Sequence, residues 1–351
     1  MYPALSIRQN LVDRFEDTLW VGGEGGMEAA LVSRQGIPFR AIPAAGLHGV
    51  GLSKLPGNMM KLARGFFASA RILREFKPDV LLFTGGFVAV PMALAGRKVP
   101  TLLYVPDIEP GKALQMLAKF ADVIALTTPD SKKYFSSARK MVVTGYPTRG
   151  DLKKLDKNTA RKQMGLTGSL PVLLIVGGSK GARLVNQAVT RQLPDLLAKL
   201  QIIHITGELD WPEIEKVAAS LPSDLGKRYH AFPYLHEEMA AAFSSADIVL
   251  SRAGASTLGE LPFYGLPAIL VPYPFAWRYQ KVNADYLADK GAAIVVENSA
   301  LDEKLMPTLT SILGEKGRLQ SMSAAMTSLA QPDAANKIAS LVWELAERTD
   351  R

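Results

Sequence analysis

Short apolar runs alternate with amphipathic stretches along most of the chain. Each run holds four to six residues, and in the stretches between them apolar residues recur every three or four positions. This alternation predicts parallel β-strands joined by α-helices, as in doubly wound α/β domains. The predicted strands are Thr18–Gly22, Phe39–Pro43, Asp79–Thr84, Thr101–Val105, Val123–Leu126, Lys140–Thr144, Pro171–Val176, Ile202–Thr206, Arg228–Phe232, Ile248–Ser251, Ala268–Val271 and Ala293–Val296.

The predicted helices lie between these strands and also form the end of the chain. A helix comes first, at residues 2–9, without the strand and glycine turn that usually precede the first helix of such a domain. Residues 301–345 predict consecutive helices without strands. The other predicted helices include Met27–Arg34, Arg183–Lys199, His236–Ser245, Leu258–Tyr264 and Tyr279–Lys290.

Residues 145–156 predict a junction between two domains, because they hold a proline, two glycines and clustered charges. We expect a first domain over residues 1–148, a second over 149–331, and a terminal helix over 332–351 that packs back toward the first domain. A length of 351 residues suits two separate cores. Ligands of open α/β sheets bind beyond the carboxyl ends of the strands, so we expect the site in the loops that follow strands.

The composition excludes several kinds of site. The chain has no cysteine, which excludes disulfides, thiolate metal sites and a cysteine nucleophile. Its four histidines are widely spaced, so we expect no multi-histidine metal site. No apolar run reaches the length of about 18 residues that a membrane span needs, and the first residues do not resemble a secretion signal. We therefore expect a soluble, cytoplasmic protein.

The net charge of +8 comes entirely from the first part of the chain. Residues 1–150 hold 19 Lys and Arg against 11 Asp and Glu, whereas residues 151–351 hold 22 of each kind. A basic domain beside a neutral one fits an anionic partner such as nucleic acid, phospholipid or a phosphorylated substrate, and it also fits a merely solvated basic surface. The chain holds no nucleic-acid-binding motif, so we expect no nucleic-acid partner.

The strongest candidate for ligand binding is the glycine-rich turn after Pro171–Val176. Gly177, Gly178 and Ser179 lead from this strand directly toward a helix. Glycine lets the backbone approach a phosphate closely, and a helix N-terminus offers free N–H groups and partial positive charge. Such a turn can also serve only the tight packing of strand and helix. Its spacing is neither a Walker A nor a dinucleotide-binding pattern, so ATP and NAD are not the expected ligands.

Two later strand ends also lead polar residues into a helix. These residues are Ala255, Ser256, Thr257 and Glu260 after Ile248–Ser251, and Gln280 and Asn283 after Ala268–Val271. The first group can present N–H and hydroxyl groups to a pyrophosphate and a carboxylate to a ribose diol. The two amides are three residues apart on a helix, so both can bind sugar hydroxyls. Each residue also has a plainer explanation, since acidic residues favour a first helical turn and amides are common on solvated surfaces.

Residues 54–77 predict a helix with two distinct faces and, with six Lys and Arg against one Glu, a charge of +5. We expect one face to pack on the sheet: Leu55, Met59, Leu62, Phe66, Ala70 and Leu73. A neighbouring stripe mixes apolar and cationic side chains: Met60, Arg64, Phe67, Arg71 and Arg74. This stripe suits an anionic membrane surface, and it also suits a core helix whose cations reach solvent.

The three turn motifs, in this order and spacing, resemble the donor domain of the MurG family of glycosyltransferases. The resemblance covers nearly the whole chain, including Tyr2-Pro3-Ala4-Leu5, Thr84-Gly85-Gly86-Phe87 and Gly145-Tyr146-Pro147-Thr148-Arg149. That family transfers N-acetylglucosamine from UDP to undecaprenyl-diphosphate-linked muramyl-pentapeptide in peptidoglycan synthesis. The resemblance implies the GT-B fold, with two Rossmann-like α/β domains that face a cleft, and here without the first strand of the first domain. It also implies inversion of the anomeric centre, with no cofactor and no metal in the active site.

The resemblance assigns roles to most of these residues. The donor UDP-N-acetylglucosamine is expected to meet Arg149, Gly177, Gly178, Ser179, Leu235, Ala255, Ser256, Thr257, Glu260, Gln280 and Asn283. Arg149 and residues 255–257 would hold the diphosphate, and the backbone near Leu235 or His236 would contact the uracil. Glu260 would bind the ribose, and the two amides would bind the sugar. Gly85 and Gly86 fall on the side of the acceptor.

The first domain departs from the family pattern. The family's glycine-rich loop, which ends in a histidine proposed as general base, would precede Tyr2. The family's His-Glu-Gln-Asn at the end of the fourth strand is replaced by Tyr104-Val105-Pro106-Asp107. We hypothesise that either the gene start is placed too late or a carboxylate has become the base. Asp107 and Glu109 are the nearby candidates for that base, and both can also be loop acids without a chemical role.

The sequence therefore predicts a glycosyltransferase that uses UDP-N-acetylglucosamine and acts on a polyprenyl-diphosphate-linked acceptor. We expect it to be a peripheral protein on the anionic, cytoplasmic side of the cell membrane. Two alternatives remain. A related enzyme would glycosylate another lipid such as diacylglycerol, and a nucleotide-sugar-binding protein would bind the donor without catalysis.

Overall fold

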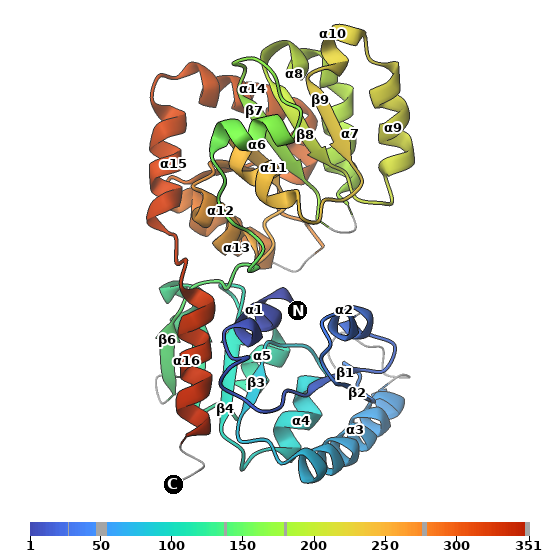
Figure 1. Ribbon diagram of the computed structural model, residues 1–351, viewed down its shortest axis with the longest axis vertical. Coiled ribbons are helices and arrows are strands. Elements are labelled where there is room, and N and C mark those ends of the chain that lie inside the picture. The colour runs from blue at the N-terminus through green and yellow to red at the C-terminus, as the bar shows by residue number, and fades with distance from the viewer. Residues whose placement is uncertain (27, 47–54, 137–138, 179–180, 276–278, 348–351) are drawn as a thin grey trace. The chain divides into compact units, whose positions relative to one another are not determined.

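The protein divides into two compact units (Figure 1). The computed structural model describes residues 1–26, 28–46, 55–136, 139–178, 181–275 and 279–347. Unit 1 consists of Met1–Arg149 and Asp333–Arg351, and unit 2 consists of Gly150–Pro332. Among the helices of the described residues, none is both long and apolar enough to cross a membrane.

The strands of unit 1 form two parallel sheets. β1 (Trp20–Gly23) pairs with β2 (Phe39–Ile42). The second sheet has the order β3-β4-β5-β6, with β3 (Leu81–Phe83), β4 (Thr101–Val105), β5 (Val123–Leu126) and β6 (Lys140–Val143). Every residue of β4 and β5 is buried, which explains why both read as unbroken apolar runs in the sequence. Val21 of β1 packs against the same apolar core as the larger sheet, so the two sheets share one core.

The helices of unit 1 come from both ends of the chain. They are α1 (Tyr2–Gln9), α2 (Glu28–Arg34), α3 (Leu55–Phe76), α4 (Ala89–Ala95), α5 (Lys112–Leu117), the 3₁₀ helix η2 (Pro129–Tyr134) and α16 (Ala334–Ala346). α16 contacts α1 and β4, and its Trp343 ring lies edge-on to Phe15 with centroids 5.4 Å apart. The last helix of the chain is therefore part of the core of unit 1.

The buried face of α3 differs from the sequence prediction. Met59 is 58% exposed and Phe66 is 36% exposed, so neither packs on the sheet as expected. The helix instead buries Gly65 and Ser69. A Cβ atom on Gly65 would lie 2.2 Å from the carbonyl oxygen of Pro43, so the helix approaches the chain there through its smallest residue. Close backbone packing on small residues leaves Met59 and Phe66 in solvent, whereas Ile72 and Leu73 of the same helix pack against the core.

In its described residues, unit 2 contains one sheet of six parallel strands in the order β12-β11-β10-β7-β8-β9. The strands are β7 (Val172–Val176), β8 (Gln201–Ile205), β9 (Tyr229–Phe232), β10 (Ile248–Ser251), β11 (Ala268–Leu270) and β12 (Ala293–Val295). The chain runs outward from β7 to β9 and then returns to β10 on the other side of β7. The junction of β7 and β10 is therefore the topological switch point of this sheet.

Helices separate the strands of unit 2. They are α6 (Lys157–Gln163), α7 (Arg183–Arg191), α8 (Leu193–Lys199), α9 (Trp211–Ser220), α10 (Ser223–Gly226), α11 (Met239–Ser245), α12 (Thr257–Tyr264), α13 (Tyr279–Asp289), the 3₁₀ helix η3 (Asn298–Ala300), α14 (Leu301–Gly314) and α15 (Arg318–Ser328). Apolar residues of α7, α8, α9 and α14 form one core with strand residues such as Ile175 and Leu250. The predicted helix 183–199 is in fact two helices, because Pro194 starts the second one after Gln192.

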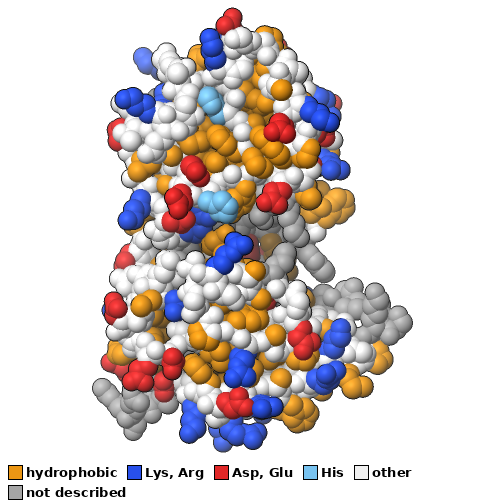
Figure 2. Space-filling model, turned by 45° about the vertical axis from the view of Figure 1, so that its right-hand side comes forward, with side chains coloured by type: hydrophobic (Ala, Val, Ile, Leu, Met, Phe, Trp, Pro, Cys, Tyr) orange, Lys and Arg blue, Asp and Glu red, His pale blue; other side chains and the backbone are white. Residues whose placement is uncertain are grey.

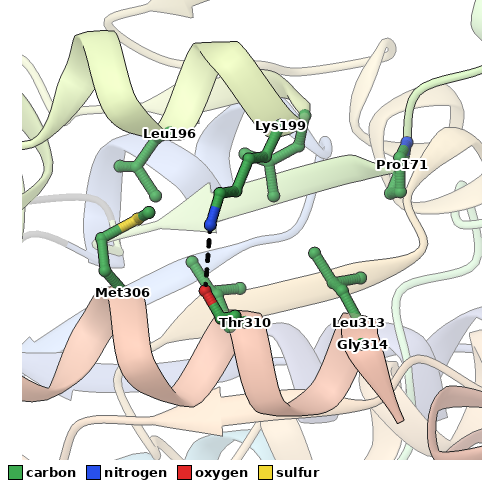
Figure 3. Close-up of a pocket in the computed structure, with 9 residues that line it drawn as sticks. Pro171, Leu196, Lys199, Met306, Thr310, Leu313 and Gly314 are labelled. Carbon is green, nitrogen blue, oxygen red and sulfur yellow. Dashed lines mark hydrogen bonds between the residues drawn. The ribbon is translucent and has the colours of Figure 1, made fainter.

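A cavity of about 250 Å³ lies between α8 and α14 (Figure 3). Leu196, Met306 and Leu313 line it, and Lys199 Nζ donates to Thr310 Oγ1 at 3.3 Å. Pro171, which also lines the cavity, directly precedes β7. The cavity therefore lies toward the amino ends of the strands, away from the edge where α/β sheets bind ligands.

Candidate functional site

Two of the predicted turns flank the switch point of unit 2. Gly177 and Gly178 follow β7, Gly181 and Ala182 precede α7, and residues 252–256 follow β10. β7 and β10 are hydrogen-bonded neighbours whose last residues, Val176 and Ser251, are paired. The structure therefore brings both turns to the same edge of the sheet, and each one leads to the N-terminus of a helix. This edge can bind an anion through backbone N–H groups and the partial positive charge of two helix starts.

The turn after β7 depends on glycine at specific positions. Gly178 and Gly181 have φ values of +83° and +77°, a conformation that L side chains rarely adopt. A Cβ atom on Gly181 would lie only 2.5 Å from the carbonyl oxygen of Thr206. Gly177 N donates to Ile205 O at 3.3 Å, which ties the start of the turn to β8. The predicted donor residue Ser179 lies outside the described residues.

The turn after β10 is closed by its own hydroxyl group. Thr257 is buried, and its Oγ1 donates to Gly254 O at 2.6 Å. This bond caps the turn, so the Thr257 hydroxyl proton is not directed at a ligand in this structure. Ala255 and Ser256 are half-buried at the tip of the turn. Glu260 lies in the first turn of α12, where its backbone N–H donates to Ser256 O at 2.8 Å.

The two predicted sugar-reading amides differ in exposure. Gln280 is half-buried, and its Oε1 accepts a hydrogen bond from Tyr273 N at 2.8 Å, which leaves its amide N–H groups on the side away from that contact. Asn283 has no exposed surface, and its Nδ2 donates to Ala253 O at 3.2 Å. Asn283 is thus bonded within unit 2, and its contact with the sugar stays a prediction. Its burial fits a residue that positions α13 against the turn after β10.

Arg252 is a residue of this edge that the sequence interpretation missed. Its Nη1 donates to Val271 O at 3.0 Å and to Asn298 Oδ1 at 2.7 Å. Its guanidinium lies over the ring of Tyr273, 5.4 Å from the centroid, and burial lowers the pKa of Arg252. The side chain thereby connects the turn after β10 with the loop after β11. The available signal was an arginine directly after a fully buried strand.

Leu235 follows β9 at the same edge of the sheet. Its side chain is buried, so any contact with a ligand must come from its backbone. The rings of Tyr234 and His236 on either side of it lie edge-to-face with centroids 4.6 Å apart. The contact with uracil stays a prediction.

Four predicted residues of unit 1 lie at the carboxyl edge of its larger sheet. Gly85 and Gly86 follow β3 with φ values of +109° and +88°. Asp107 and Glu109 follow β4, the neighbour of β3, and both are half-buried. Arg149 also belongs to unit 1, and its guanidinium lies over the ring of Tyr2, 5.3 Å from the centroid. The two carboxylates and the two glycines therefore share one edge, as the order of the strands requires.

The cationic and apolar stripe of α3 is exposed. Met60 is 66% exposed and Phe67 is 71% exposed. Arg64 and Arg74 are exposed as well, while Arg71 Nε donates to Glu75 Oε1 at 2.8 Å. Figure 2 shows cationic and hydrophobic side chains close together in the lower part of its view. Within the described residues, no cluster of three or more His, Cys, Asp or Glu side chains could hold a metal ion.

The two units of parallel strands and the helix-opening turns at a switch point are those of the GT-B class of glycosyltransferases. The glycosyltransferase family 28 N-terminal domain matches residues 1–126, and the glycosyltransferase family 28 C-terminal domain matches residues 172–338. Within this class, the chain belongs to the MurG family.

The relatives and a solved structure support this assignment over the full chain. A curated protein of Roseiflexus sp., named UDP-N-acetylglucosamine–N-acetylmuramyl-(pentapeptide) pyrophosphoryl-undecaprenol N-acetylglucosamine transferase, is 40% identical over 94% of this chain and 84% of its own. A protein of the same name from Desulforamulus reducens is 35% identical over 99% of this chain and 96% of its own. The crystal structure of Acinetobacter baumannii MurG has a TM-score of 0.78 at 28% identity and covers 98% of this chain and 95% of its own.

Proposed function

We propose that this protein transfers N-acetylglucosamine from UDP-N-acetylglucosamine to undecaprenyl-diphosphate-linked N-acetylmuramyl-pentapeptide, which is the step from lipid I to lipid II in peptidoglycan synthesis. The observation that carries this proposal is the similarity over nearly the whole chain to relatives whose names state that reaction. The two helix-opening turns at the switch point of unit 2 supply a physical reason for donor binding there.

In this proposal, unit 2 binds the donor. The starts of α7 and α12 direct N–H groups and partial positive charge toward the diphosphate. Arg149, which belongs to unit 1, is the cation that the family resemblance assigns to the diphosphate. In an inverting transfer, the acceptor hydroxyl attacks the anomeric carbon while UDP leaves as an anion. Groups placed to stabilise the charge that develops on UDP lower the barrier most, because they are already oriented before the reaction. Glu260 accepts hydrogen bonds from the ribose hydroxyls, and Gln280 binds the sugar.

The acceptor hydroxyl must lose a proton as it attacks. Asp107 and Glu109 are our proposed bases, because both follow β4 at the carboxyl edge of unit 1, beside the glycine turn after β3. A positioned carboxylate typically contributes about 10²–10⁴ in rate. Gly85 and Gly86 allow the backbone to approach the acceptor closely at the same edge.

The stripe of α3 is our proposed membrane contact, on the cytoplasmic side of the cell membrane. Exposed aromatic and methionine side chains can insert shallowly, and each nearby cation contributes about 1 kcal/mol of attraction to anionic lipid. Met60 and Phe67 are more than half exposed, with Arg64 and Arg74 close to them along the helix. A lipid-linked acceptor requires an enzyme that works at the membrane surface.

The test uses the full chain with labelled UDP-N-acetylglucosamine and, in separate reactions, a soluble lipid I analogue, diacylglycerol or no acceptor. We expect label in the lipid I analogue alone. Transfer to diacylglycerol instead would replace the proposed acceptor. UDP binding by calorimetry without any transfer would instead indicate a nucleotide-sugar-binding protein. Absence of UDP binding would overturn the assignment of unit 2 as the donor domain.

A further inference from the structure

A chain of buried polar side chains runs beside the glycine-rich turn of unit 2. It begins at Tyr229 on β9, passes through His204 on β8 and Asn186 on α7, and ends at Asp210 before α9. Each of these side chains is at least nine-tenths buried. Buried polar groups cost free energy unless they are hydrogen-bonded, and each of these four side chains has a hydrogen-bond partner.

The direction of each hydrogen bond follows from the partners of Asn186. Its Nδ2 donates to Thr206 O at 2.9 Å and to Asp210 Oδ2 at 2.8 Å, so its Oδ1 is the atom that faces His204. His204 Nε2, 3.0 Å away, must therefore carry the proton and donate to Asn186 Oδ1. His204 Nδ1 is then an acceptor, and the Tyr229 hydroxyl donates to it at 2.8 Å. Burial lowers the pKa of His204 to about 3, which keeps the ring neutral as this pattern requires.

Asn186 and Asp210, at one end of this series of hydrogen bonds, hold the glycine-rich turn after β7. Thr206 O, which accepts from Asn186, is the atom that leaves no room for a side chain at Gly181. Asp210 Oδ1 accepts from Arg183 Nε at 3.0 Å, and Arg183 is the first residue of α7. The polar chain therefore fixes the end of the glycine turn and the start of α7 against the end of β8. No contact of these side chains with a substrate is needed for that effect.

We propose that His204, acting through Asn186, is a positioning residue for the glycine-rich turn and so for the diphosphate of the sugar donor. The inference rests on the proposed function, because it assumes that this turn binds the donor. The neutral Nε2–H form of His204 holds the Asn186 amide in one orientation, and that orientation keeps Thr206 O and Asp210 in place. Loss of the His204 donor leaves the buried Asn186 Oδ1 without its partner and removes one of the three hydrogen bonds that hold the Asn186 amide, so the turn is held less firmly.

The experiment compares variants of the full chain in steady-state transfer assays and in UDP calorimetry. His204→Phe keeps a ring but removes the donor, whereas His204→Gln restores an N–H near the position of Nε2. Tyr229→Phe removes only the hydroxyl that holds the tautomer. The matched control is His230→Phe, because His230 is the neighbouring histidine on β9 but points to the opposite face of the sheet. Nitrogen NMR of the His204 ring reports its tautomer directly.

We expect His204→Phe to raise the KM for the donor and the Kd for UDP at least tenfold, with the KM for the acceptor unchanged. His204→Gln and His230→Phe should keep the native values of these constants, and the native ring should be neutral with its proton on Nε2. Should His204→Phe fail to fold, Tyr229→Phe carries the test, with an expected rise in donor KM of about threefold. Native donor constants in His204→Phe and Tyr229→Phe, or equal losses for both substrates, would overturn the inference. Failure of the native protein to bind UDP would instead overturn the proposed function.

Discussion

Asn283 and Ala253 are joined by a hydrogen bond inside unit 2, and neither residue has any exposed surface. The Nδ2 atom of Asn283, on α13, donates to the carbonyl oxygen of Ala253 in the turn after β10 at 3.2 Å. Helix α13 and the turn after β10 are thereby held in a fixed relation. Arg252 of the same turn also donates to Val271 O, directly after β11. The carboxyl edge of this sheet is thus held by internal polar bonds as well as by its core.

Replacement of Asn283 by alanine should weaken both folding and donor binding. It leaves the buried carbonyl of Ala253 without this donor, which costs about 1–3 kcal/mol. We expect a lower free energy of unfolding by urea and a raised donor KM. Asn158→Ala is the control, since Asn158 is exposed on α6 and its loss should change stability by less than about 0.5 kcal/mol. Equal stability of the two variants would contradict the positioning role of Asn283.

A Cβ atom at Gly181 should be more damaging than one at Gly168. Both glycines have a φ of +77°, so alanine at either position costs about 1–2 kcal/mol of backbone strain. Only Gly181 has an atom in the way, the Thr206 carbonyl oxygen at 2.5 Å, whereas Gly168 has nothing within 4 Å. We expect Gly181→Ala to lower UDP affinity at least tenfold and Gly168→Ala to leave it native. Calorimetry and thermal unfolding measure the two effects, and native UDP affinity in Gly181→Ala would count against the turn as a binding element.

Phe67→Ser should reduce binding to anionic vesicles. The side chain is 71% exposed on the α3 stripe, so its loss should not disturb the core. Leu209→Ser is the matched control, because Leu209 is equally exposed but belongs to unit 2. We expect co-sedimentation with vesicles of anionic phospholipid to fall several-fold for Phe67→Ser alone, and binding of the native protein to fall at high salt. Vesicle binding that is insensitive to both changes would place the membrane contact elsewhere.

His204 should make folding stability depend on pH. Burial lowers its pKa from 6.5 to about 3, so between these values the unfolded chain binds a proton that the folded protein does not. Stability from this group is complete above about pH 6.5 and falls as the pH decreases, by about 1.4 kcal/mol per pH unit down to about pH 3. We expect His204→Gln to flatten the pH dependence of the free energy of unfolding by that amount. Parallel curves for the two proteins would show that the ring titrates normally.

Asp107→Asn and Glu109→Gln test the proposed base. The variant that removes the base should lower kcat about 10²–10⁴-fold and leave UDP affinity native, because the donor is bound by unit 2. Asp130→Asn serves as control, since Asp130 is exposed in η2 after β5. Native kcat in both amide variants would remove these carboxylates from the mechanism and leave the base to be found elsewhere.

The sequence by itself determined the strands and the turns that follow them. β4, β5 and β10 have the bounds that their apolar runs predict, because strands covered on both faces require unbroken apolar sequence. The glycine turn after β7 and the polar turn after β10 were visible for the same reason, since each interrupts an apolar run just before a helix. Their order along the chain already implied the α/β class.

Only the tertiary structure decided which side chains face inward. Periodicity placed Met59 and Phe66 in the core, but Gly65 and Ser69 allow a closer approach, so the larger side chains remain in solvent. Asn283 has an amide side chain of the kind that can bind sugar hydroxyls. Its burial follows from the position of Ala253 in the folded protein. The bonds of His204 join residues 18 and 25 positions away along the chain. Local sequence patterns describe what a residue prefers, whereas partners of this kind exist only once the strands are side by side.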